Sequence, residues 1–144
     1  MTISKEIFDY LLSHMLDIHK RKISIISPYS HDYDTYMKML NFLNAYIRRI
    51  GDFLDTASVT DDQSDIPFAV LGSIVYAEGC ESPVRSVYKI VLPEETQQAT
   101  ASAESVHACL TPVSDALLFK KKGDRVTINE QGRTKRYTIK KIVI

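Results

Sequence analysis

The residue types that most often carry catalysis are scattered along this 144-residue chain. His14 and His19 are five positions apart, a spacing that does not place two side chains on one face of a helix. The other histidines, His31 and His107, have no partner nearby in the sequence. These spacings predict structural histidines rather than a metal site or a catalytic pair.

The other common carriers of chemistry are missing too. Cys80 and Cys109 lie far apart and in no CxxC pattern, so we expect two reduced, half-buried thiols. The sequence contains no P-loop, GxGxxG, GxSxG or HExxH motif. It therefore predicts a protein that is not itself an enzyme and that binds no cofactor stably.

Charge and hydropathy limit the partners. Eighteen acidic and eighteen basic residues give a net charge of zero, whereas duplex nucleic acid favours a surplus of Lys and Arg. We therefore expect no sequence-specific nucleic acid binding. Lys5, Glu6 and Asp9 interrupt the apolar start, so it does not resemble a signal peptide. No apolar run approaches the roughly 20 residues of a membrane span, and we expect a soluble, cytoplasmic protein without a membrane partner.

Residues 1–60 have the pattern of an antiparallel helical hairpin. The turn at 27–34 contains Pro28 and cap-forming Ser and Asp residues, which predicts that one helix ends near Ile26 and the next begins at 30–34. In the second helix the apolar residues recur in alternating steps of four and three, which is a coiled-coil seam. Its members are Tyr36, Leu40, Leu43, Ile47, Ile50, Leu54 and Ala57; the first helix continues it with Phe8, Leu11, Met15, Ile18 and Ile25, interrupted by Lys22.

The acidic residues 61–65 predict a linker, after which the pattern changes to that of strands. A short helix at 113–119 should begin at Thr111-Pro112, and a polar loop should cover 96–105. A hairpin turn is expected at 129–132. Residues 66–144 therefore predict an antiparallel sheet with one small helix, and the whole chain an α+β fold. The expected strands are 68–76, 84–92, 106–110, 125–128 and 134–143.

Four pieces of this second half resemble the Gre-type transcription elongation factors. Residues 111–126 are similar to a family segment that reads Ser-Pro, Ala-Leu-Leu, a Lys-rich turn and Gly-Asp. Residues 71–75 resemble its Gly-Ser-x-Val strand, and 88–95 resemble its Tyr-x-Ile-Val-x-Pro-x-Glu strand end. Residues 132–142 match its final hairpin. The pieces follow the family's order across about 66–144.

The resemblance implies a function. Gre factors join an antiparallel coiled coil to an FKBP-like domain that binds bacterial RNA polymerase at its secondary channel. Acidic residues at the coiled-coil tip then help to hold a Mg²⁺ shared with the polymerase, which cleaves backtracked RNA. On this resemblance the partner-binding residues here are Thr111, Pro112, Lys120, Lys121 and Lys122, and the Lys run could meet an acidic polymerase surface or RNA.

The chain departs from the family at the coiled-coil tip and at the partner-binding segment. An ungapped alignment puts Ile26 and Tyr29 where the family has its two tip acids. Asp32 and Asp34 could serve as metal ligands instead, although their spacing favours helix capping. Leu110 stands where the family has an Asp before Ser-Pro. We expect a polymerase-binding regulator for which cleavage stimulation is open, as in a non-cleaving relative similar to Rnk or to inhibitory Gre homologues.

Two other classes of function remain open from the sequence. An FKBP-like fold could be a peptidyl-prolyl isomerase or chaperone module, which would need an apolar pocket walled by aromatic residues. The available aromatic residues, Phe68, Tyr76, Tyr88 and Phe119, are expected in the core. The heptad seam could instead make an oligomerising adaptor, and the oligomeric state is not predicted.

Overall fold

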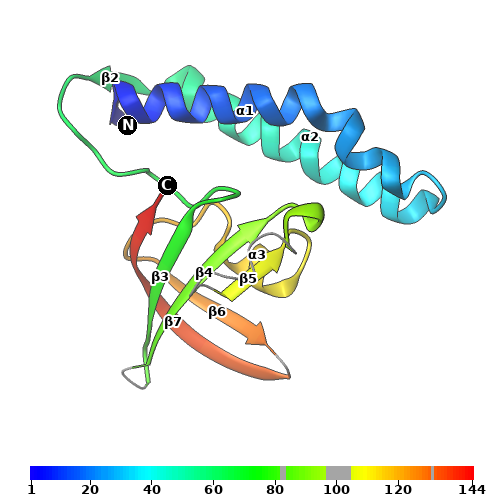
Figure 1. Ribbon diagram of the computed structural model, residues 1–144. Coiled ribbons are helices and arrows are strands. Elements are labelled where there is room, and N and C mark those ends of the chain that lie inside the picture. Colours follow the sequence, from blue (N-terminus) through cyan, green and yellow to red (C-terminus); the bar gives the residue numbers. More distant parts are fainter. Residues whose placement is uncertain (82–83, 97–104, 131) are drawn as a thin grey trace. The chain divides into compact units, whose positions relative to one another are not determined.

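The chain folds into two compact units, Met1–Asp65 and Ile66–Ile144. The first is a helical hairpin and the second a curled mixed sheet with a short helix, so the α+β expectation is confirmed (Figure 1). The computed structural model describes residues 1–81, 84–96, 105–130 and 132–144.

The hairpin consists of helix α1 (Lys5–Ile26) and helix α2 (Tyr33–Thr56), which pack side by side (Figure 1). A 3-10 turn, η1 (Ser27–Tyr29), joins them, and the predicted helix ends are confirmed. Helix α1 begins where the Ser4 hydroxyl accepts a hydrogen bond from the Ile7 N–H at 3.2 Å. No helix in the described part of the chain combines the length and apolar character of a membrane span.

Only some members of the predicted seam are buried. Leu40 and Ile47 are half-buried, and their neighbours Met39 and Tyr46 are buried instead. Alternating steps of four and three fit either stripe of the helix, and packing against α1 selects between them. Four further members of the predicted seam are also half-buried. They are Phe8 and Met15 of α1, and Tyr36 and Ala57 of α2. The predicted members that are buried are Leu11, Ile18, Ile25, Leu43, Ile50 and Leu54.

Two polar contacts cross the hairpin within this seam. The His14 Nε2 and Tyr46 hydroxyl share a hydrogen bond of 2.6 Å. The Lys22 ammonium, which interrupts the apolar pattern, donates to the Asn44 side-chain oxygen at 2.9 Å. His14 therefore has a structural role, as predicted, and the seam packs within one chain.

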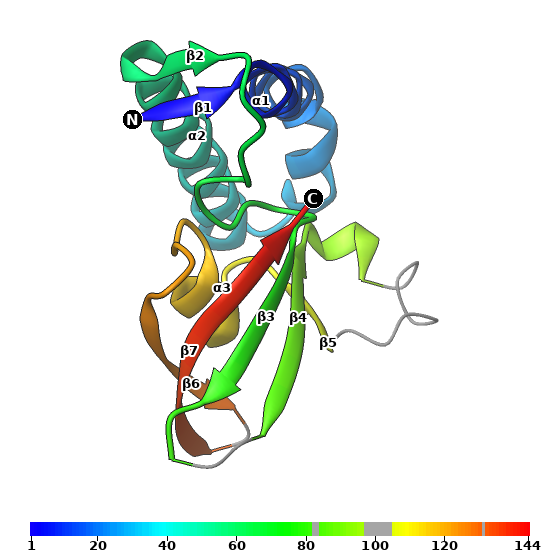
Figure 2. The same cartoon turned by 90° about the vertical axis from the view of Figure 1, so that its left-hand side faces the viewer.

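A small parallel sheet closes the open end of the hairpin and was missed by sequence reasoning. Strands β1 (Thr2–Ser4) and β2 (Ser58–Thr60) lie side by side with Ile3 opposite Val59 (Figure 2). Three-residue strands are too short to show an alternating pattern. The Ser64 hydroxyl accepts a hydrogen bond from the Ser4 N–H at 2.8 Å, so the stretch expected as a linker is tied to the hairpin.

The second unit is a five-stranded sheet that is mixed rather than wholly antiparallel. Strands β4 (Arg85–Val91) and β5 (Ser105–Ala108) are parallel, because the chain crosses back between them through η2 (Pro93–Glu95). The loop predicted at 96–105 belongs to this crossover, and its residues 97–104 lie outside the described residues. In order across the sheet, the strands are β5 (Ser105–Ala108), β4 (Arg85–Val91), β3 (Ile74–Gly79), β7 (Arg133–Val143) and β6 (Arg125–Glu130).

Helix α3 (Pro112–Leu117) packs on the inner face of this sheet (Figure 2). Side chains of a strand alternate between its faces, so every second residue enters the core. We call the side covered by α3 the inner face and the opposite side the outer face. The buried residues of the inner face are Val75, Ala77, Tyr88, Ile90, Val126, Ile128, Tyr137, Ile139 and Ile142.

Two expectations about the start of this sheet are wrong. The first strand begins at Ile74 rather than at residue 68, because a tight turn with Gly72 at φ +86° precedes it. Tyr76 is 40% exposed and does not belong to the core, since it points outward between the buried Val75 and Ala77. Of the other aromatic residues expected there, Phe68 and Tyr88 are buried and Phe119 is half-buried.

The seam observed in the structure predicts that two matched substitutions lower the free energy of unfolding by different amounts. Ile50→Ala should lower the free energy of unfolding by about 3 kcal/mol, because Ile50 is fully buried. Ile47→Ala should lower it by about 1 kcal/mol, because Ile47 is half-buried. Urea unfolding followed by circular dichroism measures both, and equal losses would support the originally predicted seam.

The two thiols should react very differently. Cys80 is exposed and Cys109 is buried, so neither is half-buried as expected. Burial, aided by the charge of Glu94, raises the pKa of the Cys109 thiol to about 12. The thiolate is the reactive form, and at pH 8 only about one in 10⁴ Cys109 side chains would be ionised. Ellman's reagent should therefore titrate one thiol in the native protein and two in urea; two equally fast thiols without urea would contradict this arrangement.

Candidate functional site

The hairpin tip, residues 27–34, presents mostly exposed polar side chains. Two backbone hydrogen bonds hold its turn, from the Ser30 N–H to the Ser27 carbonyl at 3.1 Å and from the Asp32 N–H to the Tyr29 carbonyl at 3.0 Å. Within the tip, Tyr33 is the large aromatic residue with the most exposed position, at 74%. The turn is therefore internally ordered, and a partner at the end of the hairpin would meet an aromatic ring and polar groups.

Asp32 acts as the N-cap of α2. One carboxylate oxygen accepts a hydrogen bond from the Thr35 hydroxyl at 2.7 Å, and the other accepts from the Thr35 N–H at 3.5 Å. The hydroxyl contact, followed by the backbone one, holds the pKa of Asp32 below its usual value. Asp34 lies in the first turn of α2, where a negative charge complements the helix dipole. The capping interpretation is confirmed for Asp32.

The positions aligned with the family's two tip acids carry no carboxylates in this chain. Ile26 is buried and Tyr29 half-buried at the positions aligned with the family's acids. Both carboxylate oxygens of Asp32 are already engaged by Thr35. Within the residues that the structure describes, no three His, Cys, Asp or Glu side chains are grouped as a metal site. A metal role for Asp32 and Asp34 stays a prediction.

The first half of the predicted docking segment is built around Thr111. Its hydroxyl donates to the Ala108 carbonyl at 2.8 Å and accepts from the Ser114 N–H at 3.3 Å, which caps α3. Pro112 follows as an exposed first helical residue. Leu110, which precedes Thr111, is 44% exposed and has φ +64°. An exposed leucine in the left-handed region is strained, and such strain is often found at functional surfaces.

The second half of the predicted docking segment is the turn that contains Lys120, Lys121 and Lys122, and all three residues are exposed. The Asp124 carboxylate accepts from the Lys121 N–H at 2.8 Å, and the Asp124 N–H donates to the Lys121 carbonyl at 3.0 Å. Gly123 has φ +91°, and its N–H donates to the Ile139 carbonyl of β7 at 2.7 Å. The turn is thus fixed by its backbone, and its three ammonium groups form no ion pair with any residue that the structure describes.

Helix α3 separates the two halves of this segment. Thr111 and Pro112 lie at its beginning and the Lys run follows its end. Six residues of helix span roughly 9 Å. The structure therefore places all five predicted partner-binding residues on one continuous stretch of the second unit, while Asp32 and Asp34 belong to the first unit.

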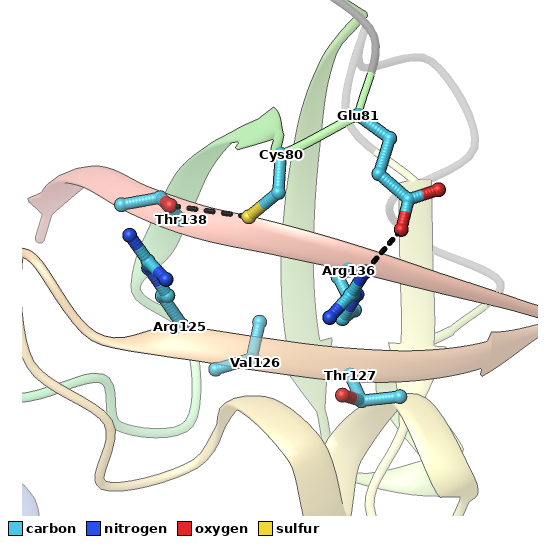
Figure 3. A pocket seen from close by; sticks show the side chains of 7 residues that line it. All are labelled: Cys80, Glu81, Arg125, Val126, Thr127, Arg136 and Thr138. Atoms are coloured by element: carbon cyan, nitrogen blue, oxygen red, sulfur yellow. Dashed lines mark hydrogen bonds and ion pairs between the residues drawn. The ribbon is translucent and has the colours of Figure 1, made fainter.

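Sequence reasoning missed a basic pocket on the outer face of the sheet (Figure 3). Its volume is about 380 Å³. The pattern Arg-x-Thr occurs at 125–127 and again at 136–138, but only the antiparallel strand register shows that these side chains share a face. The lining residues are Cys80, Glu81, Arg125, Val126, Thr127, Arg136 and Thr138.

Comparisons with solved structures find several similar proteins. Among solved structures, GreA factor homolog 1 (Gfh1) of Thermus thermophilus is 19% identical, with a TM-score of 0.47 over 99% of this chain and 97% of that one. Gfh1 of Thermus aquaticus is 16% identical, with a TM-score of 0.48 over 100% and 98%. A GreA/GreB factor from Nitrosomonas europaea is 21% identical, with a TM-score of 0.49 over 100% and 99%.

A search of curated proteins finds no significant match. The family model for the C-terminal domain of the transcription elongation factors GreA and GreB matches residues 65–143. This match covers more than half of the sequence and includes the whole segment from Thr111 to Lys122. The chain therefore belongs to the GreA/GreB family of transcription elongation factors.

Proposed function

We propose that this protein binds bacterial RNA polymerase and regulates transcription elongation without stimulating RNA cleavage. The single observation that supports polymerase binding most is the family match over residues 65–143. The protein would act in the cytoplasm, and it would contribute no catalytic group of its own. The polymerase would supply all of the chemistry.

The segment 110–124 has the properties of a docking surface. Leu110 and Pro112 offer apolar area, while Lys120 to Lys122 offer three positive charges. The backbone of both turns is fixed by hydrogen bonds before any partner arrives, which lowers the entropic cost of binding. Leu110 replaces the family's acidic residue, so an apolar contact would take the place of a charged one.

The hairpin would then enter the secondary channel. Helices of 22 and 24 residues reach roughly 33 and 36 Å. Cleavage stimulation needs carboxylate oxygens that are free to bind Mg²⁺. Here Asp32 is engaged by Thr35, and the buried Ile26 and the Tyr29 ring occupy the positions aligned with the family's acids. Such a tip would occupy the channel and exclude cleavage factors from it.

Charge reversal in the Lys run should weaken polymerase binding. Lys120→Glu combined with Lys122→Glu should raise the Kd for core RNA polymerase about tenfold or more, with a slower association rate, because rim charges steer encounter. Biolayer interferometry with immobilised polymerase measures both quantities. The matched control is Lys140→Glu combined with Lys141→Glu, which changes the same charge on the outer face.

The control pair should change the Kd less than threefold. If the unsubstituted protein does not bind core polymerase at micromolar concentration, the proposal is wrong. If both pairs weaken binding equally, the docking surface is not the segment 110–124.

The tip makes a separate prediction. Asp32→Asn combined with Asp34→Asn removes both carboxylates but keeps a good N-cap, so the hairpin should stay folded. Added to backtracked elongation complexes, the protein and this variant should both leave the rate of RNA cleavage unchanged, and both should slow the cleavage driven by a true cleavage factor. Faster cleavage with the unsubstituted protein, lost in the variant, would contradict the non-cleaving proposal.

A further inference from the structure

The two halves of the chain differ in charge although the whole chain is neutral. Residues 66–144 contain eleven basic and eight acidic residues, whereas residues 1–65 contain seven and ten. Part of the basic excess lies on the outer face of the sheet, away from the Thr111–Lys122 segment and α3. The exposed cations of this face are Arg85, Arg125, Arg136, Lys140 and Lys141.

The pocket of Figure 3 concentrates two of these cations. In the ladder of β6 and β7, Arg125 lies opposite Thr138 and Thr127 lies opposite Arg136. The two arginines are therefore diagonal neighbours, a separation of roughly 7 to 8 Å that long side chains can bridge. The four side chains point to the same outer face (Figure 3). Two arginine and two threonine side chains thus line one open pocket.

Only one of the two arginines is neutralised. Glu81 forms an ion pair with Arg136, and this pair raises the pKa of Arg136 further. Within the part of the chain that the structure describes, Arg125 has no carboxylate partner. The Cys80 thiol and the Thr138 hydroxyl share a weak contact of 3.4 Å beside it. The pocket therefore keeps a net positive charge next to hydrogen-bond donors, which suits a phosphate group.

A second pocket of about 570 Å³ continues the outer face across β3 and β4. Tyr76 lies on it, exposed, with Val87 as its partner on β4 and Lys141 as its partner on β7. Glu78, which also lines this pocket, pairs in the ladder with Thr138 of the first pocket, so the two pockets adjoin. An exposed aromatic ring thus has an apolar neighbour on β4 and a cation, Lys141, on β7, and Arg85 lines the same pocket.

We propose that this outer face binds single-stranded RNA. Phosphates would sit at Arg125, Arg136 and Lys141, and one base would stack on Tyr76, the combination by which single strands are held without sequence preference. Duplexes offer no free base to the ring, and an acidic peptide would satisfy the cations but not Tyr76. The surface is distinct from the polymerase-docking segment, and the inference does not depend on polymerase binding.

The test uses the full chain without polymerase. Fluorescence anisotropy with a labelled twelve-nucleotide oligouridine should show binding at 50 mM salt with a Kd of roughly 10⁻⁵ M. Arg125→Gln combined with Arg136→Gln should weaken it about tenfold or more and flatten the salt dependence by roughly 1.4 units, since two phosphate contacts are lost. Tyr76→Ser should weaken binding about tenfold without changing the salt dependence, and Tyr76→Phe should restore it.

Three controls separate this proposal from simple charge attraction. Lys120→Gln combined with Lys122→Gln removes equal charge from the docking segment and should change the Kd less than threefold. Duplex RNA of the same length and polyglutamate should bind at least tenfold more weakly than the oligouridine. Equal binding of polyglutamate or duplex RNA, an equal loss in the Lys variant, or no binding of oligouridine at 50 mM salt would overturn the proposal. Circular dichroism confirms that each variant is folded.

Discussion

The pairing of β7 with both of its neighbours is the constraint on which the second unit depends. This strand runs antiparallel to β3 on one side and to β6 on the other. Its register places Tyr137 and Ile139 in the core and Arg136 and Thr138 on the outer face. Ile139 also pairs with both ends of the Gly123–Asp124 turn, through hydrogen bonds of 2.7 and 2.9 Å. One strand register therefore positions the Lys run, the core and the basic pocket together.

In the hairpin, helix capping and the predicted metal binding would compete for one carboxylate, that of Asp32. Asp32 holds Thr35 with both carboxylate oxygens, and this contact begins the longer helix. Loss of this cap to a metal would leave the Thr35 N–H without its side-chain acceptor, at a cost of about 1 kcal/mol. The tip thus favours an ordered helix start over a free acidic cluster, which agrees with a factor that occupies the channel without changing its chemistry.

Local chemistry predicted much of the fold. Pro28 and the caps around it predicted the helix ends, and Thr111-Pro112 predicted the start of α3. The hairpin signal at 129–132 predicted the pairing of β6 with β7, although Asn129 and Glu130 belong to β6 itself. What failed depended on packing between segments distant in sequence. Met39 and Tyr46 replaced Leu40 and Ile47 because α1 selects the stripe of α2 that it covers. The strands β1 and β2 were too short to recognise, and β5 is parallel because of a crossover. The basic pocket was invisible for the same reason, since its residues meet only through strand register.

The central claim is that the segment 110–124 docks on RNA polymerase while the hairpin tip enters the channel. Hydrogen–deuterium exchange of the full chain, alone and with saturating core polymerase, tests both parts in one measurement. The account predicts slower exchange of backbone amides in 110–124 and in 27–34 when polymerase is present. Unchanged exchange in both segments, in a sample where binding is saturated, would contradict it.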